Sequence, residues 1–109
     1  MTNPTTEDLI HEVGMERDRQ NMKWGTRFAG RDPNTWLAIL LEEVGEVAEE
    51  IDPEALVVEL VQVAAVALSW AEHVPTQGRT GTFPEGQIFR LEAMQLGDRA
   101  KALLEERFS

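Results

Sequence analysis

The chain has 109 residues, a length typical of one domain with a modest core, and 42% of them are apolar, as in globular proteins. It contains no cysteine, which excludes disulfides, zinc–thiolate sites and thiol catalysis. The formal net charge is −10, and a surface of this sign repels the phosphates of nucleic acid. We therefore expect a single domain, residues 1–109, that does not bind nucleic acid.

The negative charge is concentrated in the middle of the chain. Between residues 32 and 78 there are ten Asp or Glu residues and no Lys or Arg, whereas acidic and basic residues balance elsewhere. Carboxylates that lie close together without a counter-charge repel one another, and a bound cation relieves that repulsion. A solvated acidic face is the simpler interpretation of such a segment, and both interpretations stay open at this point.

The first predicted helix covers residues 6–24. Thr5 and Asp8 have the spacing of a capping box at its start, and Gly25 is placed to end it. Its apolar residues are few, so we expect this helix to pack against another element.

Two further helices are predicted with almost no loop between them. Each begins with an Asp–Pro pair, at 32–33 and 52–53, in which the aspartate is the N-cap and the proline lies in the first turn. The second helix is expected to end at about residue 51 and the third at about residue 73. A connection this short predicts an antiparallel helix hairpin, which brings Trp36 and Trp70 together in the core.

The third helix is long and apolar enough to raise the question of a membrane span. It contains Glu59 and Gln62, however, and has no flanking basic residues, so we interpret it as a buried helix. The N-terminal residues lack a basic region followed by an apolar one, so we expect no secretory signal and a cytoplasmic location.

A loop rich in Pro, Gly and Thr precedes the last predicted helix, residues 86–108, and no segment alternates with the period of a strand. The sequence thus predicts an all-α fold, a helical bundle of four helices per chain built on the antiparallel hairpin. The third helix is too apolar on every face for this chain to bury alone, so we expect oligomerisation to complete the bundle.

Four oxygen-bearing side chains recur at helical spacing on the hairpin. Glu43 and Glu46 lie three residues apart on the second helix, and Glu59 and Gln62 on the third, so each pair shares one helix face. When the two faces meet, the four side chains form the oxygen-rich environment that Mg²⁺ or Mn²⁺ prefers. The pattern predicts a divalent-metal site. Gly45, in the middle of the helix, indicates a close approach by a neighbouring helix or a ligand.

A structural interpretation of the same residues stays open beside this one. Glu59 is then a core glutamate paired with Arg17 or Lys23 of the first helix, and Gln62 caps a backbone group of a neighbour. The remaining glutamates of the second helix are more typical of solvated surface. Among them, Glu49 and Glu50 stay candidates for an outer ligand or a base.

The segment EEVGEVAEE followed by ELVQV resembles the signature of the MazG-like all-α nucleoside triphosphate pyrophosphohydrolases. Three of the four positions in that family's Glu-x-x-Glu and Glu-x-x-Asp pairs match, and the likeness covers about residues 12–74, with a C-terminal loop and helix over 75–109. The resemblance implies cleavage of a nucleoside triphosphate between its α- and β-phosphates, giving a monophosphate and pyrophosphate. It also implies Mg²⁺, with Mn²⁺ as a substitute, and a homodimer or a dimer of dimers.

Gln62 stands where the family has Asp. An amide oxygen still binds Mg²⁺ but brings no charge, so this site holds a second metal more weakly. ELVQ is also similar to the form found in actinobacterial and phage-type relatives. Three functions therefore stay open: an active hydrolase, a nucleotide-binding or regulatory module with weak or no turnover, and a structural helical oligomer.

The end of the first helix, ERDRQNMKWG, resembles the basic, aromatic-ended first helix of the same family. The resemblance implies that Arg17, Gln20 and Lys23 contact the substrate, and that the two positive side chains do so at its phosphates. It also implies that Trp24 contacts the base. Catalytic roles then fall to Glu46, Glu50 and Lys23. The alternative is that Trp24 seals the core and the arginines are solvated.

Overall fold

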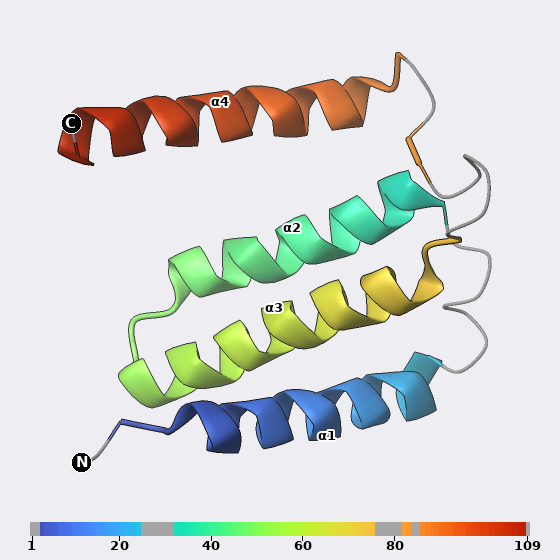
Figure 1. Cartoon of the computed structure of the whole chain (residues 1–109), viewed down its shortest axis with the longest axis vertical. Helices are drawn as coiled ribbons and strands as arrows, with labels where there is room; N and C mark the ends of the chain where they lie inside the picture. The colour runs from blue at the N-terminus through green and yellow to red at the C-terminus, as the bar shows by residue number, and fades with distance from the viewer. Residues whose placement is uncertain (1–2, 25–31, 76–81, 84–85, 109) are drawn as a thin grey trace.

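A computed structural model describes residues 3–24, 32–75, 82–83 and 86–108. These residues form four helices and, within those ranges, no strand (Figure 1). The helices are α1 (Thr6–Trp24), α2 (Pro33–Glu49), α3 (Pro53–His73) and α4 (Ile88–Phe108). The predicted all-α class is confirmed. Two bounds differ slightly from the predicted ones: α2 ends at residue 49 rather than 51, and α4 begins at residue 88 rather than 86.

The predicted helix starts are confirmed by their capping hydrogen bonds. The Asp32 side chain accepts a hydrogen bond from the Thr35 amide at 2.7 Å, and Asp52 accepts one from the Ala55 amide at 2.9 Å. Each carboxylate satisfies an amide that the first turn of a helix leaves unpaired. These caps fix where α2 and α3 begin, and therefore which face each later side chain occupies.

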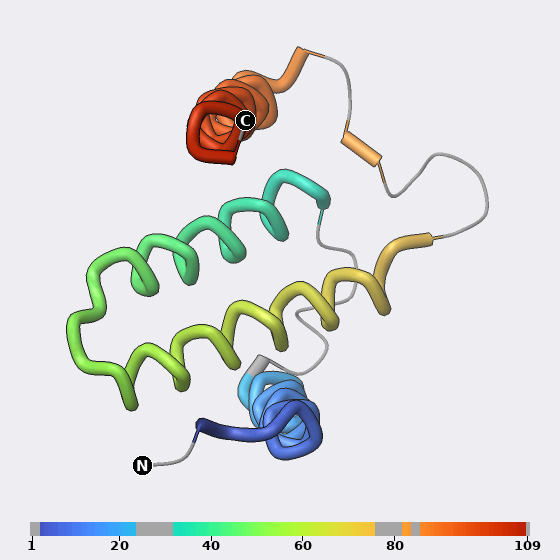
Figure 2. The backbone as a smooth tube through the Cα atoms, turned by 60° about the vertical axis from the view of Figure 1, so that its left-hand side comes forward, coloured from blue at the N-terminus to red at the C-terminus, as the bar shows by residue number. Residues whose placement is uncertain are grey.

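Helix α3 lies between α1 and α2 and packs against both (Figure 1). Residues 50–52 connect the neighbouring ends of α2 and α3, which lie side by side in both ribbon views. Figure 2 shows α1 and α4 nearly end-on, so both cross the direction of α2 and α3. Within the described parts of the chain, α2 is the only helix that α4 contacts appreciably.

The apolar core is small and lies where α2 and α3 are joined by aromatic stacking. Trp36 is only 2% exposed, and its ring stacks on Trp70 with centroids 6.4 Å apart, as predicted. Ala65 and Val66 of α3 are also buried, and so is Pro33 at the start of α2. No described atom lies within 4 Å of the position a Cβ would take at Gly45, so the expected approach of a neighbouring helix is not found among the described residues, and the approach of a ligand stays a prediction.

By length and composition α3 also suits a membrane span, the one such helix within the described ranges. Within this chain, 22% of its most apolar window is buried, and α1 and α2 both pack on it. A core helix of a soluble protein has the same length and composition, so the expectation that no membrane is involved stays a prediction.

The Asp52 cap is expected to stabilise α3. Replacing it with alanine leaves the first turn of α3 without its side-chain acceptor, so we expect Asp52→Ala to lower the free energy of unfolding by about 1 kcal/mol. Asp52→Asn keeps an acceptor oxygen at the same place and serves as the matched control. Urea denaturation followed by circular dichroism measures both. Equal stability of the alanine and asparagine variants would show that the cap does not stabilise α3.

Candidate metal centre

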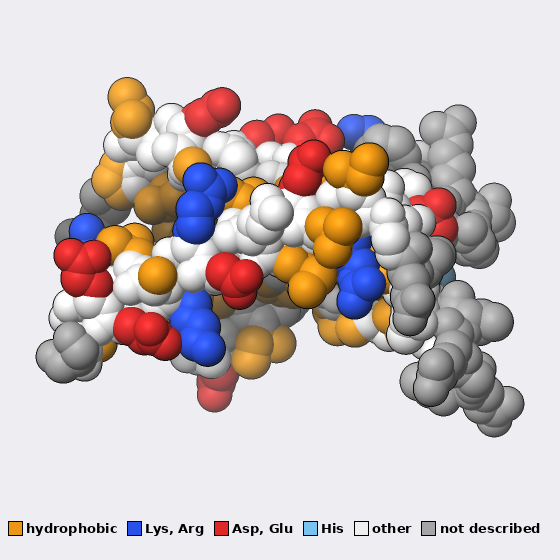
Figure 3. All heavy atoms as spheres, turned by 90° about the horizontal axis from the view of Figure 1, so that it is seen from above, with side chains coloured by type: hydrophobic (Ala, Val, Ile, Leu, Met, Phe, Trp, Pro, Cys, Tyr) orange, Lys and Arg blue, Asp and Glu red, His pale blue; other side chains and the backbone are white. Residues whose placement is uncertain are grey.

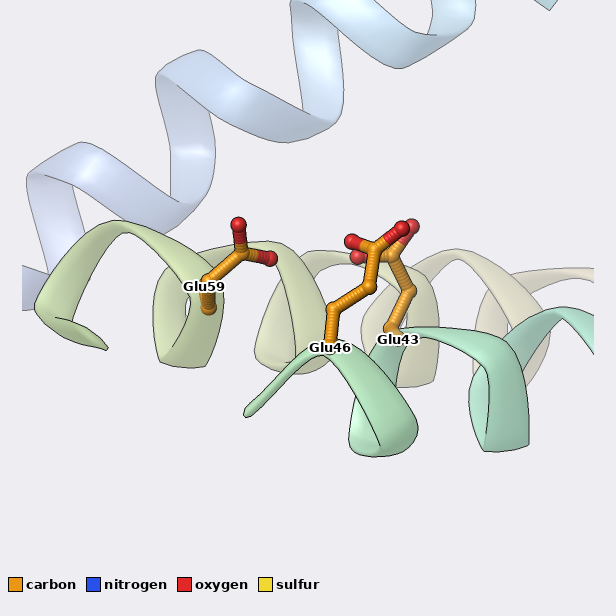
Figure 4. Close-up of side chains that lie close together, drawn as sticks. All are labelled: Glu43, Glu46 and Glu59. Carbon is orange, nitrogen blue, oxygen red and sulfur yellow. The ribbon is translucent and has the colours of Figure 1, made fainter. Parts of the chain in front are cut away.

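Three carboxylates from two helices converge beside α1. Glu43 and Glu46 from α2 and Glu59 from α3 point to the same side of the helix pair (Figure 4). One oxygen from each lies within 4.8 Å of the others. The three-residue spacing on α2 and the register of α3 produce this convergence, which the sequence predicts. Glu46 is exposed while the other two are half-buried, so the cluster is open to an incoming ligand.

Gln62 lies one turn beyond Glu59 and completes the set of four. With its amide nitrogen turned toward the carboxylates, it donates to Glu59 Oε2 at 3.0 Å and to Glu43 Oε2 at 3.3 Å. In the opposite orientation its carbonyl oxygen faces the same carboxylates, an arrangement that is favourable only around a cation. The Gln62 amide therefore suits the cluster with or without a cation. Without one it donates hydrogen bonds to the carboxylates, and with one its oxygen is a neutral ligand.

The electrostatics of the cluster favour a positive charge at its centre. Burial raises the pKa of Glu43, and the negative charges of Glu46 and Glu59 raise it further. Burial also raises the pKa of Glu59, followed by its hydrogen bond and charge repulsion with Glu46. Both shifts mean that the ionised carboxylates are unfavourable as they stand. Their oxygens fit a hard divalent ion, which relieves the repulsion directly.

A polar hollow of about 220 Å³ lies between this cluster and α1. Its lining residues come from three helices: Glu16, Arg19, Gln20 and Lys23 of α1, Glu43 of α2, and Gln62 of α3. Two predicted substrate-binding residues, Gln20 and Lys23, therefore lie beside two predicted metal ligands. Positive side chains of α1 thus face the acidic pair of helices.

Glu16 was not predicted as a site residue, and Arg19 was predicted only as part of the basic stripe at the end of the first helix. Both lie on the same face of α1 as Gln20 and Lys23, at intervals of three and four residues, which is the signal that groups them. The sequence gives no sign that Glu16 is buried, because its burial depends on how α1 crosses α3. In the structure Glu16 is only 6% exposed, and it pairs with the guanidinium of Arg19.

Arg17 does not line the hollow. Its guanidinium forms a two-pronged pair with the carboxylate of Glu72 near the end of α3. This hydrogen bonding raises the pKa of Arg17 and lowers that of Glu72. The pair holds α1 against α3, and the substrate-binding role of Arg17 stays a prediction.

Glu50 and Trp24 complete the set of predicted site residues. Glu50 lies at the end of α2, where its Oε1 accepts hydrogen bonds from the amides of Ile51 and Asp52, each at 3.2 Å. It therefore orders the connection to α3, and its catalytic role stays a prediction. Trp24 ends α1, and its side chain lies outside the described part of the chain.

Comparison with known proteins found no matching family model, no similar curated protein and no similar solved structure. The likeness to the MazG-like hydrolases therefore stays a hypothesis, and function has to be argued from the site itself.

The raised pKa values predict how pH changes the effect of a metal. A carboxyl group whose folded-state pKa is raised adds stability below its unfolded pKa, and this contribution is lost as pH rises through the folded pKa. Binding of Mg²⁺ depends on pH in the opposite sense, because protons compete for the oxygens of Glu43 and Glu59. We expect the Mg²⁺-induced rise in Tm to be largest at neutral pH and to shrink as pH falls from about 7.5 to about 5.

Thermal denaturation with and without Mg²⁺ across that range measures this effect. In Glu59→Gln we expect a higher Tm than wild type without metal at neutral pH, because a repelling charge is removed, and little response to Mg²⁺. Glu54→Gln, an acidic residue in the first turn of α3 outside the cluster, is the matched control and should respond like wild type. A Glu59→Gln variant that responds fully to Mg²⁺ contradicts the assignment.

Proposed function

We propose that the protein is a divalent-metal-dependent nucleotide pyrophosphohydrolase. It cleaves the α–β phosphoanhydride of ribo- or deoxyribonucleoside triphosphates and gives a nucleoside monophosphate and pyrophosphate. The convergence of Glu43, Glu46 and Glu59 carries the proposal, since their oxygens lie within 4.8 Å of one another. Carboxylates at this separation suit Mg²⁺ or Mn²⁺, the usual partners of phosphate groups.

The residues of the cluster fit such an ion, and each has a distinct task. Glu43, Glu46 and Glu59 hold one or two ions, and the amide oxygen of Gln62 is a neutral fourth ligand. An ion at this place supplies charge neutralisation for the phosphates and a lower pKa for the attacking water. Glu46 is the exposed member of the cluster, so its carboxylate is the one placed to orient that water.

The phosphates need a second source of positive charge, because the metal ligands themselves repel them. Lys23 and Arg19 line the α1 side of the hollow, across from Glu43 and Gln62. In this position they neutralise charge that develops on the departing pyrophosphate and help to hold the triphosphate in line. Gln20 on the same wall offers a polar contact, and Trp24 at the end of α1 contacts the base.

A nucleotide-binding or regulatory module with weak or no turnover is the second candidate. Gln62 favours it, because the cluster then has three negative charges and binds a second ion more weakly. Gln62→Asp distinguishes the two, since it restores the fourth charge and confers turnover on a protein that otherwise only binds.

We also propose that the chain, with α2 and α3 as its antiparallel hairpin, assembles as a cytoplasmic homodimer or dimer of dimers through α4 and the outer side of α2. Helix α4 has no buried residue and contacts mainly α2. Figure 3, viewed from the α4 side, shows hydrophobic side chains exposed among charged ones. Those on α4 are Ile88, Leu91, Met94, Leu96, Leu103, Leu104 and Phe108. So much exposed apolar surface is typical of a contact with another chain.

The hydrolysis itself is tested by pyrophosphate release from a panel of canonical and modified nucleoside triphosphates, with Mg²⁺, with Mn²⁺ and with a chelator. We expect release of pyrophosphate rather than single phosphate, stopped by the chelator. Glu43→Gln and Glu59→Gln should each lower the rate by about 100-fold or more, because each removes a charged ligand.

Glu54→Gln again serves as the control and should hydrolyse at the wild-type rate. Unchanged hydrolysis in both cluster variants contradicts the mechanism. If no nucleotide is hydrolysed but metal still raises the Tm, the result supports the nucleotide-binding or regulatory module instead.

Assembly is tested by light scattering coupled to gel filtration. We expect a dimer or tetramer for wild type and a smaller species for the double variant L91E/M94E, because charge on α4 disfavours an apolar contact. Glu54→Lys changes the charge at an exposed position of α3, away from α4, and should leave the mass unchanged. A monomeric wild-type protein contradicts this proposal.

A further inference from the structure

Gln20 is a buried amide with an unused acceptor. Only 9% of the residue is exposed, and its Nε2 donates to Glu16 Oε1 at 3.2 Å. Its carbonyl oxygen has no hydrogen-bond partner among the described residues, and the side chain lines the polar hollow. A buried carbonyl without a donor is unfavourable, so this oxygen indicates a ligand that supplies one.

Glu16 binds one end of the Gln20 amide. Because its carboxylate takes the hydrogen bond from Nε2, the carbonyl oxygen of Gln20 is the end left for another partner. Glu16 is itself 6% exposed, lines the same hollow and is paired with Arg19 on its outer side. The α1 wall thus presents an unpartnered carbonyl oxygen beside a carboxylate, and an occupant that donates a hydrogen bond to the carbonyl satisfies it.

The hollow is large enough for a hydrated ion. A water molecule occupies about 30 Å³ of liquid volume, so about 220 Å³ corresponds to roughly seven waters. That volume is large enough for an ion with its inner water shell. Mg²⁺ in particular prefers six oxygens in an octahedron and keeps waters at the positions that protein ligands leave unfilled.

The charges around the hollow agree with a divalent occupant. Its walls and the adjoining cluster carry four carboxylates, from Glu16, Glu43, Glu46 and Glu59. Arg19 and Lys23 supply two positive charges, so two negative charges are left over for one divalent ion.

We propose that Glu16 and Gln20 hold the water shell of the divalent ion that the carboxylates of α2 and α3 bind directly. Metal-bound waters donate hydrogen bonds to Gln20 Oε1 and to the Glu16 carboxylate. This role rests on the metal centre of the proposed function and adds ion selectivity to it. An ion that keeps its waters, such as Mg²⁺, gains these contacts, whereas Ca²⁺ takes more protein oxygens directly and gains less. Gln20 is therefore a positioning residue, acting on the ion through water.

The test measures metal binding by the whole protein without nucleotide. The paramagnetic resonance signal of free Mn²⁺ gives the Mn²⁺ affinity, and displacement of Mn²⁺ gives those of Mg²⁺ and Ca²⁺. We expect Gln20→Leu, which removes the acceptor at similar length, to weaken Mg²⁺ and Mn²⁺ binding by about 10-fold or more and Ca²⁺ binding by less. Gln20→Glu keeps an acceptor oxygen and should retain Mg²⁺ binding.

Asn21→Leu changes the exposed neighbour of Gln20 and is the matched control, with wild-type affinities expected. Circular dichroism and the metal-free Tm check that each variant folds. Hexaamminecobalt(III) adds a second readout, because its ammines are not displaced and it binds only through its shell. It should displace Mn²⁺ from wild type and do so less well in Gln20→Leu.

Equal Mg²⁺ affinity for wild type and folded Gln20→Leu overturns the inference, as does an equal loss for Mg²⁺ and Ca²⁺. A wild-type protein that binds no divalent ion overturns both the inference and the metal centre. Selective loss of Mg²⁺ binding in Gln20→Leu, in a protein that hydrolyses no nucleotide, supports the inference and contradicts only the hydrolase proposal.

Discussion

The mutual repulsion of three carboxylates on adjoining faces of α2 and α3 is the constraint on which the rest of the structure depends. Folding brings Glu43, Glu46 and Glu59 together although burial and like charge raise the pKa of two of them. Interactions elsewhere must offset this cost, and the stacking of Trp36 on Trp70 is the clearest of them. A cluster kept together against its own repulsion is typical of functional sites rather than of structural ones.

The positive residues of α1 divide between holding the helix and facing the cluster. Arg17 forms a bidentate hydrogen-bonded pair with Glu72, and this pair fixes the register of α1 on α3. That register turns Arg19 and Lys23 toward the hollow, one turn apart on the same face. An exposed ion pair adds little stability, but a two-pronged one adds geometric specificity. The contribution of Arg17 is therefore to place the wall that its neighbours form.

The features that the sequence predicts are those encoded by neighbouring residues. Each Asp–Pro pair marks a helix start through groups within three residues, and the Glu43–Glu46 spacing encodes a shared face. The convergence of Glu59 with that pair also follows, because a short connection leaves two helices few ways to pack. The burial of Glu16 and Gln20 escaped this reasoning, since it depends on how α1 crosses α3, and distant contacts decide that. For the same reason Arg17 could not be matched to Glu72, 55 residues away.

The division of α3 into two halves explains how one helix serves both core and site. Its second half carries the buried Ala65, Val66 and Ser69, and this part is anchored by packing. Its first half begins at the Asp52 cap and carries Glu59 and Gln62, which lie within one helical turn of each other. Because a helix has a fixed rise and rotation per residue, an anchored second half fixes where Glu59 and Gln62 of the first half point. The carboxylates therefore keep their separation without a core beneath them, and the hollow beside them stays open to solvent.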